Sequence, residues 1–146
     1  MTIKEYQEYN VLVAARERII TEFDKFERVY VSFSGGKDST VMLHLVMQEA
    51  IKRNAIVGVL IIDLEAQYAD TITHIHNMVN MYRANMDLHW VAIPMLLRNA
   101  VSNFEPRWVC WDEEKRDMWV RPKPVEAVDA SIYPFYQDKM EFEEFM

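Results

Sequence analysis

The sequence predicts an α/β fold, a doubly wound and mainly parallel sheet with flanking helices. A glycine loop at 34–36 joins a strand-like segment to a segment with helical spacing. The later segment Val57–Ile62 is almost wholly apolar, which is typical of a parallel strand covered on both faces. Strand, helix and strand at this spacing form a right-handed βαβ unit, and such units build open α/β sheets.

The first part of the chain predicts one helix on each side of a short strand. Asn10 is a candidate N-cap, and apolar residues then recur every three or four positions as far as Phe26. Thr2 and Glu5 have the spacing of a capping box. A strand is expected over 29–33, and the helix that follows the glycine loop should end near Asn54.

After Val57–Ile62 the apolar spacing predicts one more helix and one more strand, and beyond them it has no regular period. A helix should carry Ile72, Ile75, Val79 and Tyr82, followed by a strand over 88–93 that Pro94 stops. We expect a short helix over 95–103, an extended passage at Pro122 and Pro124, and a helix near Asp138. We divide the chain into a nucleotide-binding α/β domain (1–103) and an aromatic, less regular extension of that domain (104–146).

Only three strands are legible, which is few for a doubly wound domain. Three explanations remain open: later strands hidden in the extension, a longer polypeptide of which this is part, or another subunit that completes the sheet. The strands that the sequence predicts therefore form an incomplete sheet.

Composition excludes several classes of protein. The 146 residues are 51% apolar, which suits one domain with a core. A net charge of −7 argues against a broad nucleic-acid surface, and no apolar run approaches the length of a membrane span. The single cysteine, Cys110, excludes an internal disulfide, and with no signal-peptide pattern the expected location is the cytoplasm.

The glycine loop has the chemistry of an anion site. At a helix N-terminus, free backbone N–H groups and the helix dipole face one point, and Gly35 and Gly36 let a phosphate approach the backbone. Lys37 adds a positive charge, and hydroxyl donors come from Ser34, Ser39 and Thr40. Asp38 beside a phosphate suggests a bridging Mg²⁺, for which it is the candidate ligand.

The loop departs from the two common nucleotide motifs. Its glycines are adjacent, so it is neither G-x-x-x-x-G-K-[ST] nor G-x-G-x-x-G. The run Ser34-Gly35-Gly36-Lys37-Asp38-Ser39 instead resembles the PP-loop of the ATP pyrophosphatase and PAPS reductase superfamily. An ordinary glycine turn is the competing interpretation, and the match of six positions in this context favours the PP-loop.

Other stretches resemble one branch of that superfamily, the IbrA/YbdN-like proteins with a PAPS reductase domain. They are Ala14 to Ile19, Val31 to Ser39, Ile62 to Tyr68, and Trp108 to Trp111. The resemblance covers nearly the whole chain. It implies an adenine nucleotide alpha hydrolase-like fold, and it implies that the chain corresponds to the N-terminal part of longer relatives.

The resemblance also implies roles for individual residues. The residues of 34–39 would grip the β,γ-pyrophosphate of ATP or the phosphosulfate of PAPS or APS, with Lys37 and Asp38 as the catalytic pair. The backbone near Ile62 would border the adenine. Asp63 and Glu65 would reach a ribose hydroxyl or Mg²⁺, although reductases have Asp-Thr-Gly where this chain has Asp63-Leu64-Glu65.

Residues outside the loop have weaker functional signals. The reductase cysteine motif does not match at Cys110, between Val109 and Trp111, so a buried thiol is the favoured interpretation. Arg98 and Arg107 could clamp phosphates, but surface charges are favoured slightly. Core packing is favoured for Trp108, Trp111 and Trp119, and metal binding is disfavoured for His44, His74, His76 and His89.

Two functions remain open from the sequence. The first is a PAPS-reductase-like or ATP pyrophosphatase-type enzyme, a transferase or oxidoreductase of sulfur metabolism that uses ATP, PAPS or APS with Mg²⁺. The second is a nucleotide-binding regulatory or assembly module that acts with a protein partner or as a homo-oligomer. In both, the glycine loop binds an adenine nucleotide.

Overall fold

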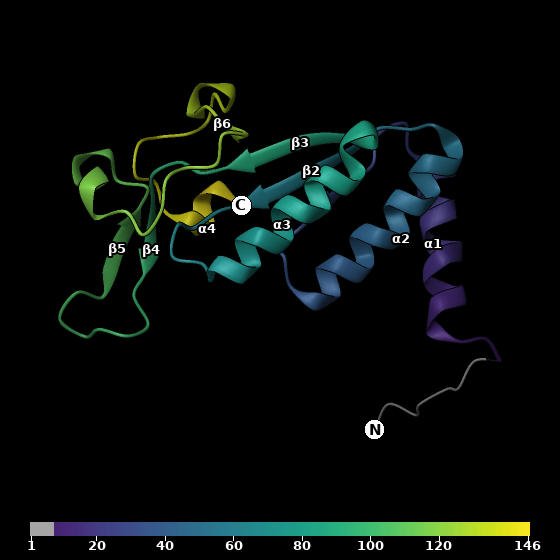
Figure 1. Cartoon of the computed structure of the whole chain (residues 1–146), viewed down its shortest axis with the longest axis horizontal. Coiled ribbons are helices and arrows are strands. Elements are labelled where there is room, and N and C mark those ends of the chain that lie inside the picture. The colour runs from purple at the N-terminus through teal and green to yellow at the C-terminus, as the bar shows by residue number, and fades with distance from the viewer. Residues whose placement is uncertain (1–7) are drawn as a thin grey trace.

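A four-stranded parallel sheet forms the centre of the molecule (Figure 1). The computed structural model describes residues 8–146, so the capping box expected at Thr2 and Glu5 lies outside the described residues. The strand order is β1-β2-β3-β6, and each neighbouring pair is parallel. The strands are β1 (Tyr30–Ser32), β2 (Val57–Ile62), β3 (Met86–Val91) and β6 (Ala127–Val128). The predicted α/β class is confirmed.

Three long helices accompany the first three strands, close to the predicted positions. They are α1 (Val11–Lys25), α2 (Lys37–Arg53) and α3 (Ala69–Tyr82). The Asn10 side chain accepts a hydrogen bond from the Val13 N–H at 3.0 Å, which confirms the predicted N-cap of α1. Asn54 ends α2 in the left-handed conformation, with φ of 50°, as its sequence position suggested.

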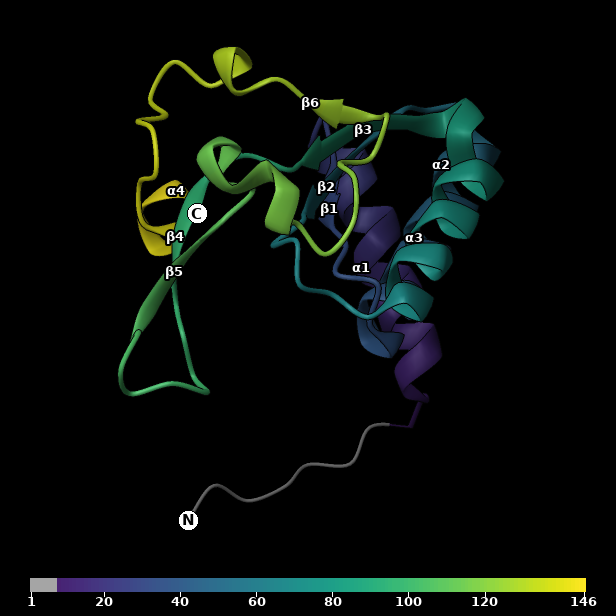
Figure 2. The ribbon, with the colours of Figure 1, turned by 60° about the vertical axis from the view of Figure 1, so that its left-hand side comes forward.

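The helices cover one face of the sheet. The chain moves from β1 to β2 to β3 in one direction, and right-handed crossovers then place α2 and α3 on the same side. Val57, Val59 and Ile61 of β2 are accordingly buried against both helices. In Figure 2 the helices lie to one side of the sheet and the C-terminal residues lie to the other.

A hairpin replaces the short helix that we expected over 95–103. Strands β4 (Met95–Arg98) and β5 (Arg107–Cys110) pair antiparallel in a separate two-stranded sheet. Met95 and Leu97 are buried, while Arg98 is exposed, so burial alternates with a period of two rather than 3.6. The prediction was wrong because a run of three apolar residues is too short to distinguish the two periods.

The extension supplies the fourth strand of the main sheet. Ala127 and Val128 pair with Trp90 and Val91, which confirms that a strand was hidden in the irregular part of the sequence. The remaining elements are short: three 3₁₀ helices at Arg83–Asn85, Glu113–Met118 and Ala130–Ile132, and α4 (Phe142–Phe145). Helix α4 begins four residues after Asp138, where we expected a helix.

Two buried carboxylates attach the extension to the end of β2. The Glu65 side chain accepts hydrogen bonds from the backbone N–H groups of Trp111 (2.7 Å) and Val120 (3.3 Å). The Asp63 side chain accepts from Trp90 Nε1 at 3.0 Å and pairs with Arg121. We call the set Asp63, Glu65, Trp111 and Arg121 the carboxylate latch.

The latch holds two residues in unusual backbone conformations. Glu65 and Trp111 have φ of 67° and 52°, in the left-handed region that non-glycine residues rarely occupy. The two are hydrogen-bonded to each other, and the Trp111 indole donates to the Asp63 carbonyl at 2.6 Å. The strain is therefore offset by bonds to groups that are buried together.

None of the helices within 8–146 is both long enough and apolar enough to cross a membrane.

We predict that Glu65→Ala lowers the free energy of unfolding by about 2 to 4 kcal/mol, because it leaves two N–H groups without an acceptor. Urea unfolding followed by tryptophan fluorescence measures this change. Glu114→Ala is the matched control. It removes an acid of the extension whose side chain is 81% exposed and whose ion pair with Lys139 should contribute at most about 1 kcal/mol. Equal effects of the two substitutions would contradict the latch.

Candidate functional site

The glycine loop (34–36) and the first residues of α2 lie at the carboxyl edge of the parallel sheet. Ser32 of β1 pairs with Leu60 of β2, and the Phe33 N–H donates to the Leu60 carbonyl at 2.8 Å. The chain therefore leaves β1 level with the end of β2 and enters α2 at Lys37. Ligands of open α/β sheets bind outside this edge.

The loop is braced by a closed ring of hydrogen bonds. The Gly36 N–H donates to Ser34 Oγ (3.4 Å), the two serine hydroxyls of Ser34 and Ser39 lie 3.0 Å apart, and Ser39 Oγ donates to the Gly36 carbonyl at 3.0 Å. Since Ser39 donates to that carbonyl, Ser34 is the donor within the serine pair. The loop thus keeps its shape through its own side chains.

The bracing leaves backbone donors pointing outward. The Gly36 carbonyl accepts from Ser39 Oγ and from both the N–H and the hydroxyl of Thr40. In a trans peptide the N–H points opposite to the carbonyl, so the Lys37 N–H faces the open end of α2. Within the part of the chain that the structure describes, the N–H groups of Lys37, Asp38 and Ser39 have no acceptor. Three amides at one helix end can hold an anion.

The two adjacent glycines serve different purposes. Gly35 has φ of +76°, and a Cβ there would lie 2.9 Å from side-chain carbons of both Ile75 and Thr71. It therefore lets the loop pack closely against α3. Gly36 has φ of −77°, and a Cβ there would meet nothing nearer than Ser34 Oγ at 3.5 Å. Its small size keeps the approach to the amides open.

Lys37 and Asp38 lie at the mouth of the loop. Lys37 Nζ is 2.7 Å from the Asp38 carboxylate, and the side chains are 87% and 90% exposed. An exposed pair contributes little to stability, so both groups can turn toward a ligand at small cost. A phosphate would compete with Asp38 for the ammonium group.

Thr40 and His74 form a contact that the sequence did not reveal. The Thr40 hydroxyl donates to the Gly36 carbonyl at 2.8 Å, and His74 Nε2 lies 2.9 Å from the same hydroxyl. His74 must therefore donate to Thr40. Its ring also meets Phe33 edge-on. Thr40 thus holds the loop in position rather than facing its mouth. No sequence signal links two residues 34 positions apart.

The carboxylates expected near the adenine have partners within the protein. Asp63 is fully buried and Glu65 is 6% exposed, and both belong to the carboxylate latch. Ile62 lies partly buried at the end of β2, two residues beyond Leu60, which pairs with Ser32. The left-handed φ of Glu65 is the conformation that glycine adopts freely, and glycine is the residue of the reductase pattern there.

The acidic residues give one candidate ligand for Mg²⁺. No group of three or more His, Cys, Asp or Glu side chains converges on one point among residues 8–146. Asp63 and Glu65 accept bonds from indole, guanidinium and backbone donors, which a cation would have to displace. Asp38 remains exposed at the loop, and Mg²⁺ is commonly held by one or two carboxylates together with substrate phosphates.

The outlying candidates are part of the protein framework. Cys110 is fully buried, and burial raises the pKa of its thiol from 9.0 to about 12. Both observations agree with the favoured interpretation of Cys110 as a buried thiol. Arg107 and Arg98 pair with Glu141 and Glu143 near the C-terminus. The Trp111 ring is fully buried and meets Trp119 edge-on at 5.2 Å, which confirms a core role for Trp111.

The fold and the loop together define a Rossmann-like α/β protein with a glycine loop at the carboxyl edge of its sheet. Residues 28–117 match the phosphoadenosine phosphosulfate reductase domain. The chain belongs to this family, which confirms the resemblance to PAPS reductases seen in its motifs. The matched range includes the glycine loop, the carboxylate latch residues Asp63, Glu65 and Trp111, and Cys110.

A relative in Escherichia coli K12 aligns with most of the chain. The uncharacterized protein YbdN is 41% identical over 139 residues, which cover 94% of this chain and 34% of YbdN. The chain thus spans about a third of the length of this relative.

We predict that Gly35→Ala lowers the free energy of unfolding by about 1 to 3 kcal/mol, because it adds both strain at positive φ and contacts at 2.9 Å. Gly36→Ala is the matched control and should cost less than about 1 kcal/mol, since its conformation suits alanine. Thermal unfolding of the two variants measures the difference. A Gly36→Ala cost as large as that of Gly35→Ala would refute the separate roles of the glycines.

We predict that Cys110 resists thiol reagents in the folded protein at pH 8 and reacts fully in guanidinium. The raised pKa of the Cys110 thiol also makes the free energy of unfolding depend on pH. Below pH 9 the thiol is protonated in the folded and the unfolded protein, so its contribution to stability is complete. Between pH 9 and about 12 the unfolded protein loses the thiol proton first, and the contribution is lost progressively. The fall in unfolding midpoint over pH 9–10.5 should be smaller in Cys110→Ala. Rapid labelling of the native thiol would show that the site is not closed.

Proposed function

We propose that the glycine loop is a PP-loop that binds the terminal phosphates, or the phosphosulfate, of an adenine nucleotide. The observation that carries the proposal is the set of three backbone N–H groups, at 37–39, which face outward at the end of α2 without an acceptor in the described part of the chain. Ser34 and Ser39 would position the loop, and Lys37 would supply the positive charge.

Membership of the PAPS reductase domain family favours a sulfonucleotide, PAPS or APS, over ATP. In that reaction a thiolate attacks the sulfur, the S–O bond to the nucleotide breaks, and the nucleotide leaves with its phosphate intact. Cys110 is the chain's single cysteine, and its burial and raised pKa exclude it as the attacking group. The thiol would therefore come from outside residues 1–146.

ATP is the alternative nucleotide. An acceptor oxygen would then attack the α-phosphorus and release pyrophosphate from the glycine loop. Lys37 would stabilise the charge of the leaving group, and Asp38 would hold Mg²⁺ together with phosphate oxygens. When bound, Mg²⁺ would neutralise charge on those oxygens. The backbone near Ile62 would border the adenine in both cases.

A second function is a nucleotide-binding module without turnover, which acts in the cytoplasm with a protein partner or as a homo-oligomer. The latch favours it, because Asp63 and Glu65 stabilise the fold instead of facing a substrate. We infer that residues 104–146 extend the 1–103 domain, since β6 and the latch join them to the same sheet.

We predict that Lys37→Ala weakens binding of PAPS, APS or ATP by roughly tenfold to a hundredfold, the range expected for one charge-assisted hydrogen bond. Isothermal titration calorimetry with each nucleotide measures the affinity and ranks the three ligands. Lys115→Ala, which removes an exposed lysine of the extension, is the control and should bind normally. Unchanged affinity in Lys37→Ala would count against the loop as the phosphate site.

An assay of reaction products distinguishes the enzyme from the module without turnover. Incubation with PAPS and a dithiol, or with ATP, Mg²⁺ and an acceptor, should release sulfite or pyrophosphate if the protein is an enzyme. Nucleotide binding without either product supports the module.

A further inference from the structure

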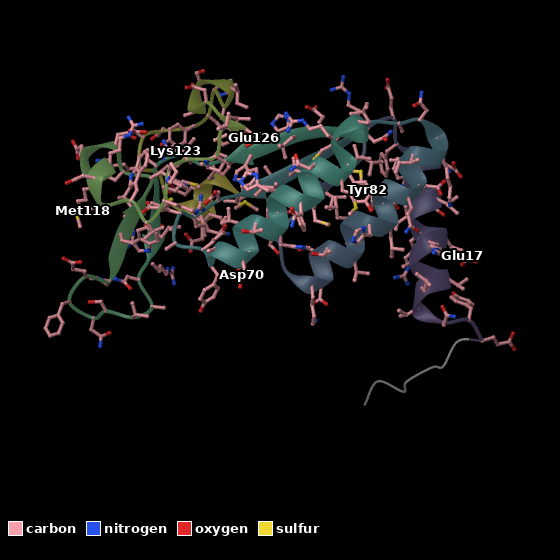
Figure 3. All side chains as sticks on the ribbon, in the orientation of Figure 1. Glu17, Asp70, Tyr82, Met118, Lys123 and Glu126 are labelled. Carbon is pink, nitrogen blue, oxygen red and sulfur yellow. The ribbon has the colours of Figure 1, made fainter. Side chains whose placement is uncertain are left out.

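A pocket lies where the connection between β2 and α3 meets the β4–β5 hairpin and α4 (Figure 1). Its volume is about 370 Å³, which is within the range of sites for small molecules. Figure 3 shows Asp70 at the end of α3 that follows this connection and Tyr82 at the far end of the same helix. Apolar side chains form much of the wall, namely Leu64, Leu97, Trp108 and Phe142.

Hydrogen bonds hold the elements around the pocket in place. The Gln67 N–H donates to the Glu65 carbonyl at 2.8 Å, and Glu65 belongs to the carboxylate latch. The Leu96 N–H donates to the Met140 carbonyl at 2.9 Å, which fastens the segment before α4 to β4. The walls of the pocket are therefore fixed by the protein itself.

The side chain of Gln67 lines the pocket and has an oxygen without a partner. Gln67 Oε1 is buried, and no donor within residues 8–146 bonds to it. Buried polar atoms nearly always have a partner, so an unpaired acceptor beside a pocket favours a ligand that brings a donor. A water molecule would find few further polar groups there, because Leu64, Leu97 and Phe142 are apolar. The terminal torsion of a Gln side chain is soft, so the amide can turn toward the donor.

The ring of Trp108 is available to an aromatic ligand. The rings of Trp90, Trp111 and Trp119 each contact another aromatic ring, whereas Trp108 has no such contact in the described part of the chain. Trp108 is only partly buried, and it lines the pocket. A flat ring inside the pocket could therefore stack on the indole or meet it edge-on.

Two opposite charges lie at the rim of the pocket. Arg98 Nε is 3.8 Å from a carboxylate oxygen of Glu143, and the two side chains are 80% and 56% exposed. An exposed pair contributes little to stability, so a ligand can separate the two groups at small cost. A zwitterion would place its carboxylate on Arg98 and its ammonium group on Glu143. The pocket thus offers apolar walls, a buried acceptor, and one charge of each sign at the rim.

We propose that this pocket binds a free α-amino acid whose aromatic side chain carries a hydrogen-bond donor. The phenol O–H of tyrosine or the indole N–H of tryptophan would donate to Gln67 Oε1, while the ring packs against Trp108. Phenylalanine would fit the same walls but would leave the Gln67 oxygen unpaired. Residues 34–36 do not line the pocket, so this site is separate from the phosphate site proposed above.

Isothermal titration calorimetry with L-tyrosine, L-tryptophan and L-phenylalanine tests the proposal in the absence of nucleotide. The first two should each bind at least about tenfold more tightly than L-phenylalanine, because a buried acceptor discriminates against a ligand without a donor. Gln67→Leu keeps the size of the side chain and should abolish this preference. The NMR signals of the Gln67 side-chain amide should shift when L-tyrosine binds. Because no nucleotide is present, the result is independent of the glycine loop.

Two analogues that each lack one charge test the rim residues. Tyramine has no carboxylate, and desaminotyrosine has no ammonium group. Arg98→Gln should weaken L-tyrosine and desaminotyrosine by at least about threefold and leave tyramine unchanged, and Glu143→Gln should weaken L-tyrosine and tyramine instead. The matched control is Glu144→Gln, at an exposed position of α4 outside the pocket wall, and it should bind all three ligands normally.

Three results would overturn the proposal. They are the absence of saturable binding by L-tyrosine and L-tryptophan, equal affinities for L-tyrosine and L-phenylalanine, and binding that leaves the Gln67 side-chain amide signals unchanged. Each is measured on the unsubstituted chain, so the test holds even if a variant does not fold.

Discussion

The geometry of the candidate site depends on one carbonyl group, that of Gly36. Three donors from Ser39 and Thr40 hold it inside the first turn of α2, and His74 holds the Thr40 hydroxyl from the next helix. A peptide group with a fixed carbonyl has a fixed N–H direction, so the same bonds that order the loop also aim its amides outward. The loop is therefore ordered without a ligand, so little conformational entropy of the loop would be lost if an anion bound there.

The second organising feature is the position of the carboxylate latch at the end of β2. A Glu in place of glycine at a left-handed position would ordinarily destabilise the turn, but Glu65 uses its side chain to satisfy two backbone N–H groups of the extension. The sequence departs from the reductase pattern at Glu65, whose side chain bonds the extension to the end of β2. Asp63 and Glu65 bond to groups of the protein itself.

The sequence predicted those features that depend on neighbours along the chain. The apolar run of β2, the Asn10 cap and the glycine loop each have a local signature, and each lies where it was expected. The hairpin after Pro94 was missed because its alternation covers only Met95 to Arg98, and β6 has two residues. The partners of Asp63, Glu65 and Thr40 were also missed, since Arg121, Trp111 and His74 meet them only through the tertiary fold.

The spacing of the latch along the chain has a consequence for synthesis of the protein. Asp63 meets Arg121 across 58 positions, and Glu65 meets Trp111 across 46. While the ribosome extends the chain, β1, α2 and β2 can pack before either partner has emerged. Until Arg121 has emerged, the Asp63 carboxylate lacks the ion pair that it has in the folded protein, so full burial of the end of β2 depends on a residue translated much later.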